Sequence, residues 1–182
     1  MSEDPLPTVM VVDDHPIWRD AVARDLAESG FNVVATADGV GAAKRRAAVV
    51  KPDVVLMDMQ LADGTGVQAT TEVLEVSPSS RVLVLSASDE RDDVLEAVKA
   101  GATGYLVKSA SKSELSDAVR ATAAGRAVFT PSLAGLVLGE YRRIAQSPDA
   151  GPVRPSLTER ETEVLRYVAK VCPPSRLPRS SY

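Results

Sequence analysis

Five short apolar runs alternate with longer amphipathic stretches between Thr8 and Gly125, and this alternation restricts the fold more than any other feature of the chain. The runs are rich in β-branched residues, which favour strands. Nearly continuous apolar runs of this length are typical of strands buried on both faces of a parallel sheet. The predicted strands are Val9–Val12, Asn32–Ala35, Val54–Met57, Val82–Leu85 and Gly104–Val107.

A stretch with helical periodicity follows each predicted strand. These helices are predicted at Pro16–Glu28, Gly39–Val49, Gly66–Val76, Asp92–Ala100 and Lys112–Ala124. On the first, one apolar stripe is predicted from Ile17, Ala21, Val22 and Leu26. Gly30 and Gly101 stand where a left-handed residue commonly ends a helix. Ser111, with Glu114 three residues later, predicts a capping box for the fifth helix.

Strands joined through helices in this order predict right-handed crossovers, and hence an α/β fold with a (βα)5 doubly wound parallel sheet. Beyond Gly125 we predict a helix at Pro131–Ile144, a proline-rich linker at Gln146–Ser156 and a last helix starting near Leu157. The predicted organisation is therefore a domain over residues 1–125, a helix and linker over 126–156, and a short helix with an irregular tail over 157–182.

Composition excludes several classes of protein. The net charge of −4 gives no electrostatic footprint for nucleic acid over the chain as a whole. One cysteine excludes a disulfide framework and a thiolate metal cluster. Because no apolar run approaches the roughly 20 residues of a membrane span, and the N-terminus lacks the apolar segment of a signal peptide, we expect a cytoplasmic protein without a membrane partner.

Polar side chains that can handle phosphate or a metal ion follow four of the five runs. They are Asp13 and Asp14, Asp58, Ser86 and Lys108. Because parallel strands end at one edge of their sheet, and ligands of open α/β sheets bind there, we expect these residues to meet in one crevice. Polar residues also close strands without any function, but five of them at four ends on one edge favour a functional site.

The chemistry of this set favours a divalent cation and a phosphoryl group. Three clustered carboxylates repel one another unless a cation intervenes, and Mg²⁺ prefers such oxygen ligands. Lys108 offers a positive charge to phosphoryl oxygens, and Ser86 offers a hydroxyl donor. Asp58 stands alone after its strand and is the predicted nucleophile, whereas the adjacent Asp13 and Asp14 form a predicted metal platform.

The segments VVDDHP, VVLMDMQLADGTG, VLVLSAS and GATGYLVK resemble the receiver domain of two-component response regulators, within its NarL/FixJ branch. The resemblance covers about Val9 to Ala124. It implies a flavodoxin-like fold and a phosphoryl group accepted by Asp58 from a histidine kinase. It also implies that Mg²⁺ is held by Asp13, Asp14, Asp58 and the main-chain carbonyl of Gln60.

The same resemblance implies a switch pair, Ser86 and Tyr105, in which the hydroxyl closes on the phosphate and the ring turns inward. The chain departs from the family at Ala62, where a proline is usual, so we expect a less rigid loop and altered rates. Gly66 keeps the family's glycine, and we therefore expect phosphorylation to be retained.

Near the C-terminus, LTERETEVLRYVAK resembles the first helix of the LuxR-type helix-turn-helix. The rest of that domain has no counterpart, because Val171, Cys172, Pro173 and Pro174 stand where the family continues with its next helix. The resemblance implies control of transcription, with a homodimer formed on phosphorylation. A full-length version would bind DNA, but this chain is not expected to bind DNA specifically.

Two other functions remain open on the residues. A Mg²⁺-dependent hydrolase with an aspartyl-phosphate intermediate usually carries a second aspartate two residues after the nucleophile, where this chain has Gln60. A stand-alone receiver would act through protein contacts only. His15 most simply opens the first helix, and Trp18 most simply packs in a partly buried position.

Overall fold

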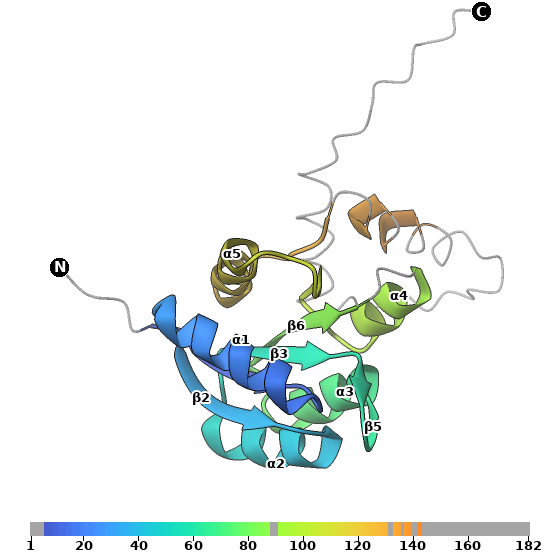
Figure 1. Cartoon of the computed structure of the whole chain (residues 1–182). Coiled ribbons are helices and arrows are strands. Elements are labelled where there is room, and N and C mark those ends of the chain that lie inside the picture. Colours follow the sequence, from blue (N-terminus) through green and yellow to red (C-terminus); the bar gives the residue numbers. More distant parts are fainter. Residues whose placement is uncertain (1–5, 88–90, 131–132, 136, 140–141, 143–182) are drawn as a thin grey trace, which may run out of the picture.

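The computed structural model describes residues 6–87, 91–130, 133–135, 137–139 and 142 (Figure 1). Its elements, in chain order, are β1 (Thr8–Val12), α1 (Pro16–Glu28), β2 (Asn32–Ala37), α2 (Val40–Val50), β3 (Val54–Asp58), β4 (Gln60–Leu61), β5 (Gly64–Thr65), α3 (Gly66–Val76), β6 (Arg81–Ser86), α4 (Arg91–Lys99), β7 (Gly104–Val107) and α5 (Lys112–Ala123). All five predicted strands and all five predicted helices are present, with ends that differ by at most two residues. The described residues contain no helix that meets the length and hydropathy of a membrane span.

The main sheet has five parallel strands in the order β2-β1-β3-β6-β7. Strand order reverses between β1 and β3, since the chain first moves outward to β2 and then crosses back past β1. This is the flavodoxin-like order of doubly wound folds, whose ligands bind at the point of reversal. The predicted fold class is therefore confirmed.

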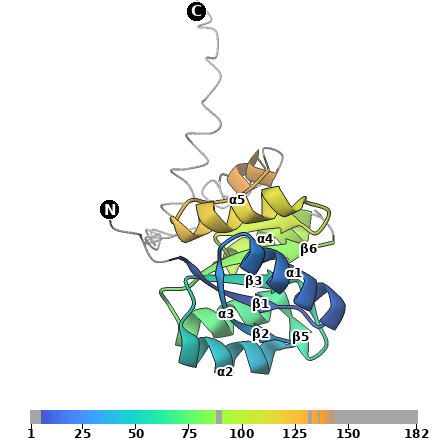
Figure 2. The ribbon, with the colours of Figure 1, turned by 60° about the vertical axis from the view of Figure 1, so that its left-hand side comes forward.

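Alternate residues of each strand enter two separate apolar layers, and helices cover both faces of the sheet (Figure 2). On one face, Val9, Val11 and Leu56 pack with side chains of α1 and α5. On the other, Met10 and Met57 pack with side chains of α2, α3 and α4. Because both faces are covered, the central strands β1, β3 and β6 are almost wholly buried, which explains their continuous apolar sequence, whereas the edge strand β2 is mostly half-buried.

The predicted stripe on α1 is wrong at Ile17 and Ala21, both of which are exposed, and right at Val22 and Leu26. Ile17 is 87% exposed, whereas Trp18 packs against the same cluster as Val22 and Leu26. The helical period explains the difference. Trp18 lies four residues before Val22 and so on the same face of the helix, whereas Ile17 is turned away from that face by about 100°. The predicted helix ends are confirmed, since Gly30 and Gly101 have left-handed φ angles of 86° and 100°.

A two-stranded hairpin, β4–β5, follows the carboxyl end of β3 and was not predicted. Gln60 pairs with Thr65, and Leu61 pairs with Gly64, so Ala62 and Asp63 form its tip. The hairpin leads directly into α3, whose N-cap is the Thr65 side chain. The expected loss of rigidity at Ala62 concerns motion and stays a prediction.

After α5 the chain returns to the edge of the sheet beside β7. The main-chain N–H of Tyr105 donates to the Val128 carbonyl oxygen at 2.8 Å, and Gly104 forms a parallel bridge with Val128. Residues 133–135, 137–139 and 142 are helical, as predicted, and Leu133 and Val137 are buried. The remaining residues of that predicted helix, the linker and the last predicted helix lie outside the described residues.

Candidate functional site

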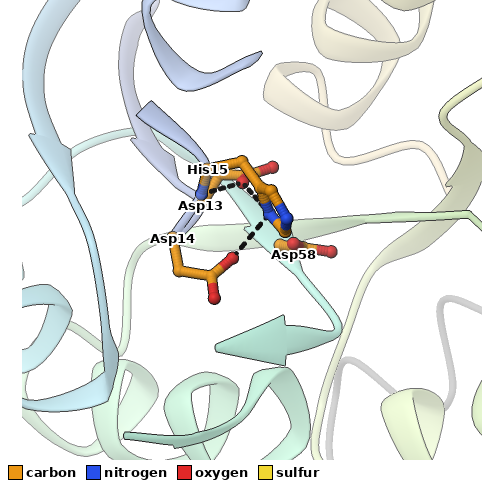
Figure 3. A group of neighbouring side chains, drawn as sticks. All are labelled: Asp13, Asp14, His15 and Asp58. Carbon is orange, nitrogen blue, oxygen red and sulfur yellow. Dashed lines mark hydrogen bonds and ion pairs between the residues drawn. The ribbon is translucent and has the colours of Figure 1, made fainter. Parts of the chain in front are cut away.

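The point where strand order reverses brings the predicted acidic residues together. Asp13 and Asp14 directly follow β1, and Asp58 is the last residue of the neighbouring β3. Together with His15, they present ligand atoms that all lie within 4.8 Å of one another (Figure 3). Asp13 and Asp58 are 2% and 5% exposed, so their charges are largely withdrawn from water.

Lys108 joins two of these carboxylates. Its Nζ atom lies 2.7 Å from Asp13 Oδ2 and 3.0 Å from Asp58 Oδ2. The lysine follows β7, and its main-chain N–H donates to the Ser86 carbonyl oxygen at 2.7 Å, which aligns the end of β7 with the end of β6. The residues predicted from four separate runs therefore meet at one edge of the sheet.

Two opposing influences act on the pKa values in this cluster: burial disfavours the charged forms, and ion pairs and hydrogen bonds favour them. Burial raises the pKa of Asp58 and the charge of Asp13 adds to this rise, although Lys108 and the main-chain N–H of Gln60 hydrogen-bond to Asp58 and partly offset it. Burial alone would lower the pKa of Lys108, but Asp13 and Asp58 together raise it. The lysine is thus held as a cation between two carboxylates.

Asp14 contributes an oxygen suited to a metal ion. Its Oδ1 atom is buried and accepts no hydrogen bond, and His15 Nδ1, 2.8 Å away, forms an ion pair with it when the imidazole is protonated. A buried carboxylate oxygen without a hydrogen bond is costly unless a cation supplies the missing interaction. With neighbouring oxygens from Asp13 and Asp58, the donor set fits a hard cation such as Mg²⁺.

The remaining predicted residues lie at the same edge or next to it. Ser86 ends β6 and is 4% exposed, while Tyr105 lies inside β7 and is fully buried. Gln60 follows the end of β3 closely enough for its N–H to reach Asp58. A metal contact of the Gln60 carbonyl and a switching motion of Ser86 and Tyr105 stay predictions.

Two residues that support the site were missed or underestimated from sequence. Arg19 Nη1 donates to the main-chain oxygen of Asp13 at 3.0 Å. Trp18 packs in a partly buried position, as predicted, but Lys108 Nζ also lies 5.5 Å from the centre of its ring, which is within range of a cation–π contact. Both residues stand one turn or less into α1, and no sequence pattern marks which way such side chains turn.

The raised pKa of Asp58 predicts that this residue costs stability in the metal-free protein. When the pKa of an acid is higher in the folded chain than in the unfolded chain, the folded protein loses stability as pH rises. The loss begins near the unfolded pKa, about 3.9, and is complete above the folded pKa. We therefore expect Asp58→Asn to raise the free energy of urea unfolding at neutral pH, with the gain vanishing below about pH 4.

Asp63 is the matched control, because main-chain hydrogen bonds from Val40 and then Gly41 lower the pKa of its carboxyl. Its stabilising contribution is present above the unfolded pKa and is lost as pH falls through the folded one. Asp63→Asn should therefore destabilise the protein at neutral pH. A loss of stability in Asp58→Asn would contradict the account of its burial.

Fold and site together define a class of protein: an α/β receiver with an acidic crevice and a lysine at its strand ends. Solved structures agree. A LuxR-family two-component response regulator from Aurantimonas sp. SI85-9A1 aligns with a TM-score of 0.68 and 35% identity, over 75% of this chain and 99% of that chain. The receiver domain of the putative response regulator NarL from Mycobacterium tuberculosis gives 0.65 and 38%, over 68% and 100%.

Sequence comparison gives the family. Residues 9–120 match the family described as the response regulator receiver domain. The probable transcriptional regulatory protein NarL of Mycobacterium tuberculosis is 41% identical over 162 residues, which cover 88% of this chain and 73% of that protein. The chain belongs to the two-component response regulators of the NarL/LuxR family.

Proposed function

We propose that this response regulator is switched by a phosphoryl group carried on Asp58. The observation that supports this most is the buried Asp58 carboxylate, which lies 3.0 Å from Lys108 Nζ beside the acidic pair. A nucleophile, a fixed cation and a place for a metal ion then stand around one point. Positioning and charge stabilisation of this kind are the main requirements of phosphoryl transfer.

In the proposed step, an oxygen of Asp58 forms a bond to phosphorus while the bond from phosphorus to the donor's leaving atom breaks. The leaving group keeps that electron pair, and the product is an acyl phosphate. No base has to deprotonate Asp58, because its carboxylate form supplies the attacking pair. Lys108 and the Gln60 N–H both hydrogen-bond to Asp58 and hold that form.

Mg²⁺ is the proposed cofactor, held by Asp13, Asp14, Asp58 and the main-chain carbonyl of Gln60. When bound, it would neutralise charge on the phosphoryl oxygens. The buried Asp14 oxygen that accepts no hydrogen bond supports this assignment, as do the three clustered carboxylates. His15 remains at the rim, where its side chain is 70% exposed and it occupies the N-cap position of α1.

The proposed donor is a histidine kinase, and the proposed consequence is a change in transcription through a homodimer. The relatives are named as transcriptional regulatory proteins, which supports this output. Within the domain, Ser86 and Tyr105 are the proposed switch pair. A hydrolase with an aspartyl-phosphate intermediate is not favoured, since the relatives are regulators and Gln60 cannot act as the second acid.

Incubation with acetyl phosphate and Mg²⁺ tests the proposal. Intact-mass measurement is expected to show the gain of one phosphoryl group in the wild-type chain, and no gain when Mg²⁺ is chelated. Asp58→Asn should remove the gain, whereas Asp20→Asn, an exposed carboxylate on α1, should leave it unchanged. A wild-type chain that gains no mass would refute the proposed function.

A further inference from the structure

The carboxylate of Asp63 links the β4–β5 hairpin, which follows Asp58, to helix α2. At the tip of the hairpin, Asp63 Oδ1 accepts a hydrogen bond from the Val40 N–H at 2.7 Å, and Oδ2 accepts one from the Gly41 N–H at 3.2 Å. These are among the first N–H groups of α2, which have no partner within their own helix. The N-cap residue, Gly39, has no side chain with which to cap them. Asp63 therefore caps α2 from 22 to 23 residues away along the chain.

Two glycines leave room for this contact. A Cβ on Gly39 would lie 2.7 Å from Asp63 Cγ and 2.8 Å from Oδ2. The φ angle of Gly39 is −176°, which any residue can adopt, so space and not backbone conformation requires glycine there. A Cβ on Gly64 would lie 2.8 Å from Val40 Cγ2. A methyl group at Gly39 would therefore displace the Asp63 carboxylate from its present place, and one at Gly64 would displace the side-chain ends of Val40 and Gln68.

Charge supports the same contact. The Val40 and Gly41 N–H groups lower the pKa of Asp63, so the residue is a carboxylate at neutral pH. A negative charge at the start of a helix also interacts favourably with the helix dipole. Although Asp63 is exposed, its orientation is fixed by two hydrogen bonds to one helix.

The hairpin in turn determines what surrounds Asp58. Gln60, whose N–H hydrogen-bonds to the Asp58 carboxylate, pairs with Thr65 across the hairpin. The Gly66 N–H donates to the Met59 carbonyl oxygen at 2.8 Å, which closes the base of the hairpin. A shift of the hairpin tip is therefore transmitted to the main chain beside the proposed phosphoacceptor.

The geometry points to Asp63 as a positioning residue for phosphorylation. Its two hydrogen bonds hold the Gln60–Thr65 hairpin against the start of α2. This role rests on the proposed phosphorylation of Asp58. Asp63 lies outside the cluster of Asp13, Asp14 and Asp58; it fixes the hairpin whose Gln60 N–H hydrogen-bonds to Asp58. Loss of residues that orient ligands in this way typically lowers metal affinity or activity about 10- to 100-fold.

The test compares Asp63→Ala with Asp53→Ala. Asp53 accepts hydrogen bonds from Thr8 N and Thr8 Oγ1 at 2.8 and 2.7 Å, but it precedes β3, at the opposite edge of the sheet. Each variant loses two hydrogen bonds to a carboxylate, so thermal unfolding should report a comparable loss of stability. Only Asp63→Ala is expected to slow phosphorylation by acetyl phosphate, by about 10-fold. It should also weaken Mg²⁺ binding, followed through the emission of the only tryptophan, Trp18.

Ala62→Pro in the Asp63→Ala background provides a rescue. Among the described residues only Lys51 is a non-glycine with positive φ, so the backbone of Ala62 is not left-handed, and it lies outside the paired positions of the hairpin. Proline there restricts the loop without the carboxylate and should restore much of the rate.

Equal phosphorylation rates in Asp63→Ala and Asp53→Ala would overturn this inference and leave the proposed function standing. So would a double variant that regains stability but not rate. A wild-type chain that accepts no phosphoryl group would overturn the proposed function, and this inference with it.

Discussion

Lys108→Ala is expected to slow phosphorylation of the chain by acetyl phosphate and Mg²⁺ by about 100-fold, the usual effect of removing one fixed donor to developing charge. The Lys108 ammonium lies 2.7 and 3.0 Å from two carboxylates that are almost fully buried. Without it, the pKa of Asp58 should rise further, because the Lys108 hydrogen bond and charge oppose that rise, and the incoming phosphoryl oxygens lose a fixed positive charge. The measurement is the initial rate of mass gain at saturating Mg²⁺.

Lys112→Ala is the matched control for this change. Lys112 also pairs with two carboxylates, at 3.0 Å from Asp25 Oδ1 and 2.6 Å from Glu28 Oε2, but these groups are solvent-exposed and join α5 to α1. Exposed ion pairs of this kind contribute little to stability. We expect the wild-type rate in Lys112→Ala. A Lys108→Ala chain that reacts as fast as this control would contradict the assigned role of Lys108.

Gly66→Ala is expected to have the largest effect on stability, a loss of about 3 kcal/mol in the free energy of urea unfolding. A Cβ at this position would lie 2.8 Å from Met59 Cα and 2.9 Å from the Asp58 carbonyl carbon. These are main-chain atoms of the phosphoacceptor segment, and the Gly66–Met59 hydrogen bond prevents α3 from simply moving away. The added methyl group should therefore displace Asp58 and slow its phosphorylation as well.

Gly135→Ala separates this effect from the general consequences of replacing glycine. Residue 135 is helical and exposed, and a Cβ there meets nothing within 4 Å. Alanine should leave stability unchanged or raise it by up to about 1 kcal/mol, because alanine favours helices. If both glycine variants unfold at the wild-type urea concentration, the close packing at Gly66 is not a constraint on this fold.

The sequence was sufficient to predict the fold class and the meeting of the site residues. Strand ends are marked by apolar runs, and parallel strands of one sheet bring those ends to one edge, so the sequence alone places Asp13, Asp58 and Lys108 together, as the structure does. Periodicity on α1 was harder to interpret, because Ile17 and Trp18 are both apolar and a shift of one residue turns the stripe by about 100°.

Contacts made by loops could not be predicted from the same patterns. The Asp63–Gly64 pair is a turn signal, but nothing in the sequence indicates that this carboxylate reaches α2. Arg19 and Trp18 likewise meet Asp13 and Lys108 through the direction of their side chains, which depends on packing between elements far apart in the chain. Such contacts depend on tertiary geometry and correspond to no periodic pattern in the sequence.

Chemical mapping of the phosphorylated residue tests the central claim most directly. Borohydride reduces an aspartyl phosphate to homoserine, so treatment after incubation with acetyl phosphate and Mg²⁺ marks the acceptor permanently. Peptide mass mapping is expected to find homoserine at position 58, and to find unmodified aspartate at positions 13 and 14. Homoserine at another aspartate, or a phosphoryl group that survives borohydride as a phosphoester, would contradict the assignment of Asp58.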